Sequence, residues 1–152
     1  MSKDDYFKLR RTYKEIEIGE TASWTRTISE RDVEAFAALI GDKHPIHIDA
    51  EYAKGTVFGE RIAHGIFTAS FFTPLIASRL SGIDGIYVSQ EIRFIRPVRI
   101  GDTIIAHATV TGKDEKKKRI TLKTTVTNQH GELIIDGMGV VAMKPGSNKE
   151  SQ

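Results

Sequence analysis

The segment from Gly65 to Leu80 constrains the fold most, because it has helical length and carries apolar side chains on nearly every side. Its apolar residues are Ile66, Phe67, Ala69, Phe71, Phe72, Leu75, Ile76, Ala77 and Leu80. A helix that is apolar all round should be buried on all sides, and Pro74 inside it predicts a kink. A chain of 152 residues is too short to bury such a helix within a large helical protein. We therefore expect a sheet to wrap around it.

The rest of the chain has the pattern of that sheet. Runs rich in strand-forming residues cover 21–28, 86–95, 103–111, 120–126 and 133–143. In one of these runs Ile120, Leu122, Thr124 and Val126 alternate onto a single face. Short turns between the last three runs predict an antiparallel meander. We expect an α+β fold, a long bent antiparallel sheet around one apolar helix, whose exposed edge strands favour a dimer.

A second helix is predicted from Ser29 to Ile40. Ser29 and Asp32 approximate a capping box at its start, and apolar residues recur at helical spacing along one face. Gly41 follows in the usual position just past a helix end. The pattern is that of an amphipathic helix lying on another part of the protein.

Composition narrows the class of protein. The net charge is only +2, from 22 Lys and Arg against 20 Asp and Glu, which argues against a nucleic-acid binder. Cysteine is absent, so disulfides, thiolate metal sites and cysteine nucleophiles are excluded. We find no apolar run long enough for a membrane span and no signal peptide at the start, and we expect a cytoplasmic protein. The basic run Lys116–Arg119 is interpreted as a solvated hairpin tip, with contact to coenzyme A phosphates as the alternative.

One domain is expected over residues 13–145. The charged residues 1–12 and the polar residues 146–152 are predicted to be tails.

The segment between the two helices, residues 41–49, concentrates chemistry-bearing side chains. Pro45 fixes its own φ and restricts His44 to extended geometry, so we predict a rigid loop and not a helix. Asp42 and His47 are five positions apart, and a turn can bring both to one water molecule. Three other interpretations stay open: a turn aspartate, a half-buried structural histidine, and a metal site formed by Asp42, His44 and His47 without a further recognisable ligand pair.

Three motifs together resemble a known family. They are Gly41-Asp42-x-x-Pro45-Ile46-His47, Ala63-His64-Gly65, and Phe94-x-Arg96-Pro97-Val98-x-x-Gly101-Asp102-Thr103. In order and spacing they resemble the MaoC-like dehydratases, which include the (R)-specific enoyl-CoA hydratases. The resemblance runs from about Ile16 to Pro145. It implies a hot-dog fold, with an overhang segment that carries the active-site loop.

The resemblance also implies an activity and its residues. Asp42 and His47 would be the catalytic acid–base pair for reversible hydration of a trans-2-enoyl thioester to the (R)-3-hydroxyacyl thioester. Gly65, at a helix N-terminus, would stabilise the thioester oxygen through its N–H, the alternative being tight packing only. Phe67 would close an acyl pocket or serve only as core. Thr73 would place a hydroxyl near the aspartate or bond the preceding helical turn.

No cofactor and no metal are expected, with coenzyme A present only as part of the substrate. The carrier, coenzyme A or acyl carrier protein, and the acyl chain length stay open, and a homodimer or higher homo-oligomer is expected. The family usually has asparagine where this chain has His44, which bears on loop geometry and pH optimum. The rival functions are a hot-dog thioesterase and a non-catalytic subunit that binds acyl thioesters.

Overall fold

Five antiparallel strands form one sheet in the computed structural model, which describes residues 10–144. The strands are β1 (Thr21–Thr27), β2 (Gly85–Phe94), β3 (Thr103–Asp114), β4 (Arg119–Thr127) and β5 (Leu133–Met143). The helices are α2 (Glu30–Ile40), α3 (Pro45–Ile48), α4 (Ala50–Lys54), α5 (Gly65–Ser70) and α6 (Phe72–Leu75), followed by a π-helical turn at Ile76–Leu80. Short 3-10 turns lie at Tyr13–Glu15 and Gly82–Asp84.

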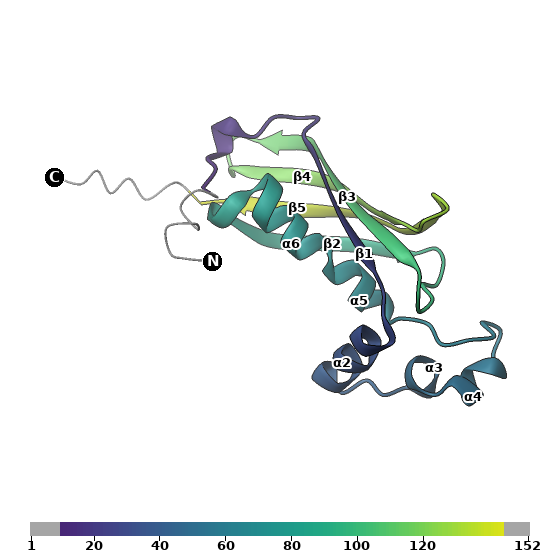
Figure 1. Ribbon diagram of the computed structural model, residues 1–152. Coiled ribbons are helices and arrows are strands. Elements are labelled where there is room, and N and C mark those ends of the chain that lie inside the picture. Colours follow the sequence, from purple (N-terminus) through teal and green to yellow (C-terminus); the bar gives the residue numbers. More distant parts are fainter. Residues whose placement is uncertain (1–9, 145–152) are drawn as a thin grey trace.

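The strand order is β1-β3-β4-β5-β2 (Figure 1). The predicted meander of β3, β4 and β5 is confirmed, as is the early strand β1, which pairs with β3. The strand that follows the central helix, β2, does not join β3, its neighbour in sequence, but pairs with β5 and forms one edge of the sheet. On β4 the predicted inner face is confirmed, because all four of its alternating residues are fully buried.

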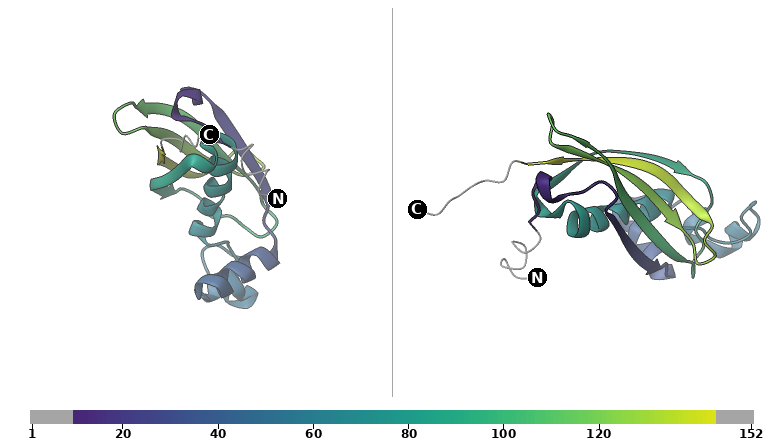
Figure 2. Two further views of the ribbon diagram at one scale, coloured as in Figure 1. Left: turned by 90° about the vertical axis from the view of Figure 1, so that its left-hand side faces the viewer. Right: turned by 90° about the horizontal axis from the view of Figure 1, so that it is seen from above.

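The central helix lies against the concave side of this sheet, as predicted (Figure 2). It is interrupted at Phe71, three residues before Pro74, because proline has no N–H to donate to the Ser70 carbonyl. The expectation of burial on all sides is wrong for the single chain: Ile66 is 58% exposed, and Thr73 is also exposed. One sheet covers only one side of a helix, and the contact that α2 adds, between Phe36 and Phe67, leaves Ile66 and Thr73 exposed.

The buried residues of the helix form the centre of the core. Phe72, Leu75, Ile76 and Leu80 are at most 2% exposed and pack against the inner faces of the strands. Burial of such side chains is the main favourable contribution to folding, at about 1.5–3 kcal/mol for each large apolar residue.

The predicted amphipathic helix is confirmed as α2. Ser29 is its N-cap and forms the capping box with Asp32, and Gly41 ends the helix at a φ of 82°. The N–H of Gly41 donates to the carbonyl of Ala37 over 2.9 Å. This left-handed residue turns the chain sharply, so that the next segment runs back beside α2.

The prediction of a non-helical loop after Gly41 is wrong in part. His44 is extended, with φ −55° and ψ 131°, as its position before proline requires. Pro45, however, begins the one-turn helix α3, since proline is well suited to the first position of a helix, where no N–H is needed. The His44 ring caps this turn, because its Nδ1 accepts the N–H of Ile46 at 3.2 Å.

The two ends of the described chain bear on the predicted domain limits. Residues 1–9 and 145–152, which hold most of the predicted tails, lie outside the described residues. Arg11 contacts the domain: its guanidinium binds the carboxylate of Glu20 at 2.7 Å and the carbonyl of Leu80 at 3.0 Å.

The basic hairpin tip between β3 and β4 is largely exposed and lies at the end of the sheet remote from α2. Within residues 10–144 no helix combines the length and apolar character needed to cross a membrane.

Candidate active site

The helices α2, α3 and α4 form an overhang beyond one end of the sheet (Figure 1). Arg61, whose side chain is only 12% exposed, ties this overhang together: it pairs with Glu30 of α2 and lies 3.4 Å from the carbonyl of Ile48 at the end of α3. The overhang joins the main body through the N–H of Ala63, which donates to the carbonyl of Val98 over 2.8 Å. The site therefore lies where the overhang meets the start of the central helix.

Asp42 follows the left-handed Gly41 directly. Its Oδ1 accepts the N–H of His44 at 3.1 Å, which is the turn-aspartate arrangement that the sequence left open as an alternative. Its Oδ2 lies 3.9 Å from Nε2 of His64, and the side chain is 51% exposed. One carboxylate oxygen thus fixes the turn, while the other faces a group of histidines.

His47 lies in α3 and is held by a backbone carbonyl. Its Nδ1 lies 2.7 Å from the oxygen of Ile62, and because a carbonyl can only accept, Nδ1 carries the proton. In the neutral ring Nε2 then has the free lone pair. Partial burial lowers the pKa of His47 most; the hydrogen bond to Ile62 opposes this, and nearby His64 lowers the pKa further.

A pH prediction follows from this lowered pKa. His47 stays neutral to a lower pH than an exposed histidine, so its Nε2 is available as a base throughout the neutral range. We expect the acid limb of the pH dependence of kcat/KM to fall below the usual histidine range, with activity retained at pH 6.5. Initial rates between pH 5 and 8 in buffers of constant ionic strength measure this limb; a midpoint above pH 7 would contradict the assignment.

His64 completes the cluster and was not among the predicted site residues. It is only 4% exposed, its ring stacks on that of His47 with centroids 3.7 Å apart, and its Nε2 lies 3.0 Å from the backbone oxygen of Asp42. The sequence showed His64 only as part of the motif before Gly65, with nothing to indicate contact with residues 22 positions earlier. The carbonyl of Ile62 left no signal at all, since any residue type can supply it.

One ligand atom from each of Asp42, His47 and His64 lies within 4.8 Å of the other two. This group differs from the metal set considered from the sequence, because His44 is occupied in capping α3 and His64 takes its place. The two histidine rings are stacked at an interplanar angle of 25°. In-plane lone pairs of stacked rings do not converge on one point, as tetrahedral or octahedral coordination needs, so the arrangement suits water and proton transfer better than a metal ion.

The three predicted substrate-binding residues lie in different places. Gly65 is exposed at the N-terminus of α5, and a Cβ there would approach the ring of Phe94 to 2.7 Å, so close packing alone also favours glycine. Phe67 packs between the rings of Phe36 and Phe71, at 5.1 and 5.3 Å. Thr73 is exposed on α6, and within residues 10–144 no hydrogen bond joins it to Asp42 or His47.

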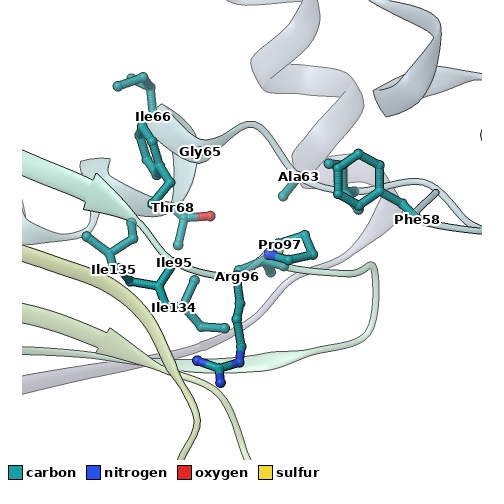
Figure 3. A pocket seen from close by; sticks show the side chains of 13 residues that line it. Phe58, Ala63, Gly65, Ile66, Thr68, Ile95, Arg96, Pro97, Ile134 and Ile135 are labelled. Atoms are coloured by element: carbon teal, nitrogen blue, oxygen red, sulfur yellow. The ribbon is translucent and has the colours of Figure 1, made fainter. Parts of the chain in front are cut away.

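A cavity of about 410 Å³ borders Gly65 and Thr68 of α5 (Figure 3). Most of its lining is apolar and comes from the start of the helix, from the end of β2 and from the start of β5. Arg96 is the charged residue of the lining, and its guanidinium points away from the apolar side chains (Figure 3). The cavity has the size and character of a site for a small apolar group.

Comparison with known proteins agrees with this fold. The family described as "MaoC like domain" matches residues 14–132. The chain is 43% identical over 141 residues to an (R)-specific enoyl-CoA hydratase of Rhodospirillum rubrum, covering 93% of this chain and 96% of that relative. It is 36% identical to a 3-hydroxybutyryl-CoA dehydratase of Methylorubrum extorquens, covering 85% of this chain and 82% of the relative.

Among solved structures, the chain is similar to the R-hydratase PhaJ1 of Pseudomonas aeruginosa in its unliganded form. The TM-score is 0.82 with 41% identity, over 88% of this chain and 85% of that one. The expected hot-dog fold, a bent antiparallel sheet around a central helix, is thereby confirmed. Because the sequence match and the shared fold both extend over most of its length, the chain belongs to the MaoC-like dehydratase family.

Proposed function

We propose that the protein catalyses the reversible hydration of a trans-2-enoyl-CoA to the (R)-3-hydroxyacyl-CoA and is thus a hydro-lyase. The observation that carries the proposal is the pair Asp42 and His47, whose ligand atoms lie within 4.8 Å of each other on the overhang. One water molecule can contact both groups across such a distance. The near full-length similarity to proteins named as hydratase and dehydratase supports the same reaction.

The protons of the reaction can be assigned to these two residues. In hydration, the carboxylate of Asp42 orients the water, and Nε2 of His47 takes one of its protons as oxygen bonds to Cβ of the substrate. His47 then returns that proton to Cα on the same face. In dehydration, the same steps run in reverse. The bond from Nδ1 of His47 to the Ile62 carbonyl keeps Nε2 as the reacting nitrogen throughout.

The start of the central helix supports the thioester end of the reaction. Negative charge builds on the thioester oxygen as water adds, and an unpaired N–H at a helix N-terminus stabilises such charge. Gly65 occupies that position and borders the apolar cavity, which supports binding of an acyl thioester there. The proposal includes no metal and no cofactor apart from the coenzyme A of the substrate.

The direct test is loss of enoyl-thioester absorbance when purified protein is mixed with crotonyl-CoA, with free thiol assayed in parallel. Loss of absorbance without thiol release, giving a product that an (R)-specific 3-hydroxyacyl-CoA dehydrogenase oxidises, is expected. Thiol release would instead indicate a thioesterase. No reaction with crotonyl-CoA or with longer enoyl-CoA substrates would favour the non-catalytic binding subunit.

We further propose a homodimer that forms through β2. The two edge strands differ: the exposed side chains of β1 are polar, such as Thr25, whereas those at and just beyond β2 are largely apolar. These apolar residues are Ile86, Val88, Phe94 and Ile95, which are 44–53% exposed. A second copy pairing along β2 would cover them, and it would also satisfy the unpaired backbone groups of the edge.

The oligomer prediction is tested by sedimentation equilibrium. We expect a mass twice the 16.9 kDa of one chain, and a shift to monomer in Val88→Lys, because a charge would then lie on the apolar edge that each copy buries. Thr25→Lys on β1 is the matched control and should leave the dimer intact. Dissociation by the β1 variant alone would place the interface at the other edge.

A further inference from the structure

His64 is a buried polar residue at the junction of core, overhang and catalytic pair. It precedes Gly65 at the start of α5, and the edge of its ring packs against Phe36 of α2 at 5.2 Å between centroids. Burial of an unpaired polar group costs free energy, so a buried imidazole is expected to make contacts that offset this cost. Its Nδ1 has no partner within residues 10–144, so any favourable role must come from Nε2 and from the ring faces.

The first contact of His64 fixes the backbone of Asp42. Nε2 lies 3.0 Å from the carbonyl oxygen of Asp42, and because the carbonyl accepts, Nε2 carries the proton. Asp42 lies beyond the end of α2, so its carbonyl has no partner inside that helix. The bond from His64 is therefore the link that holds this carbonyl, and it sets the point from which the carboxylate of Asp42 projects.

The second contact fixes the ring of His47. The stacked ring of His64 covers one face of His47, at 3.7 Å between centroids. The bond to the Ile62 carbonyl sets the direction of the His47 ring within its plane, while the stack sets the plane itself. Both contacts together leave Nε2 of His47 a single direction in which to reach a water molecule.

We propose that His64 is a positioning residue that holds both Asp42 and His47 in register for the hydration reaction. The proposal rests on the proposed function, which names that reaction. His64 itself need not touch substrate, because its proton is engaged with the backbone of Asp42 and its side chain is buried. Small displacements of either catalytic group are expected to slow the chemical step by about 10- to 100-fold.

Two variants separate the contacts. His64→Phe keeps a flat ring against His47 but removes the donor to Asp42, whereas His64→Gln keeps a donor near the position of Nε2 but removes the ring. We expect His64→Phe to lower kcat about 10- to 100-fold with KM little changed, and His64→Gln to recover part of the loss. His107→Phe, the same change at an exposed histidine of β3, is the control and should match the wild type.

The pH profile distinguishes positioning from a general loss of stability. The titratable groups acting on His47 are Asp42, His44 and His64, and only His64 is removed. In His64→Phe the burial of His47 is kept and the repulsion from His64 is lost, so the pKa of His47 rises and the acid limb of kcat/KM moves to higher pH. Unchanged kcat and pH profile, or a loss confined to KM, would overturn the proposal. If His64→Phe fails to fold, the kcat and the pH profile of His64→Gln test the proposal instead.

A measurement without substrate keeps this proposal separate from the function. The ¹⁵N and ¹H resonances of the histidine rings report the tautomer and titration of His47 directly. We expect His47 with its proton on Nδ1 in the wild type and titration at higher pH in His64→Phe. An unchanged His47 titration would count against positioning by His64 even in an active enzyme. If the protein hydrates no enoyl thioester but His47 still titrates at higher pH in His64→Phe, the contact between His64 and His47 is supported and only the proposed reaction is excluded.

Discussion

Asp42→Asn is expected to lower kcat/KM for hydration of the preferred enoyl-CoA by about 10³-fold, while the protein stays folded. The amide removes the negative charge that orients the water but keeps an oxygen that can accept the N–H of His44, so the turn after α2 is preserved. Steady-state rates from enoyl-thioester absorbance, together with circular dichroism of the purified variant, measure both halves of this expectation.

Asp49→Asn is the matched control for that substitution. Asp49 caps α4 by accepting the N–H of Tyr52 at 3.0 Å, and asparagine caps a helix about as well as aspartate. We expect this variant to keep wild-type rates. His47→Ala should lose activity as Asp42→Asn does, because it removes the base that shares the water. Near wild-type activity in Asp42→Asn would exclude the pair as the catalytic machinery.

Phe72→Ala is expected to have the largest effect on stability, lowering the free energy of unfolding by about 3–5 kcal/mol. Phe72 is 1% exposed in α6, at the centre of the core between the helix and the sheet. Truncation loses the burial of the ring and leaves a cavity that the closely packed strands cannot fill. Urea unfolding at one fixed protein concentration measures the change.

Leu39→Ala on α2 serves as the comparison for this prediction. Leu39 is 83% exposed, so its truncation removes little buried surface, and the change should stay within about 0.5 kcal/mol. An equal loss of unfolding free energy in Leu39→Ala and Phe72→Ala would contradict the prediction, because it would mean that burial in the single chain does not determine the effect of truncation.

Much of the fold was predictable because its signals are local. The caps of α2, the alternation along β4 and the turn residues between the last three strands each act within a few residues of one another. The place of β2 was not predictable in this way, since pairing with β5 is decided by how the sheet curves round the helix. The exposure of part of the central helix was not predictable either, because exposed apolar residues such as Ile66 have the same sequence pattern as core residues.

The residues of the candidate site also differ in how far they could be predicted from the sequence. Asp42 and His47 lie in one short segment, so their spacing and the family resemblance were enough to predict that they come together. The helical turn at Pro45 was missed because proline both restricts the residue before it and begins helices. His64 and the Ile62 carbonyl reach the site only through tertiary contact, which no local pattern records.

Five rings stand in sequence from the central helix to the catalytic base: Phe71, Phe67, Phe36, His64 and His47, each in contact with the next at 3.7–5.3 Å between centroids. His47, which carries the proposed reacting nitrogen, lies at one end of this row, and Phe71, which packs against the core, lies at the other. Truncation of Phe67 would therefore remove the ring that supports Phe36 and, through Phe36 and His64, the ring of His47. The proposed base is thus coupled to the packing of the central helix, and we expect a substitution at Phe67 to change the rate of turnover without any direct contact with the reacting atoms.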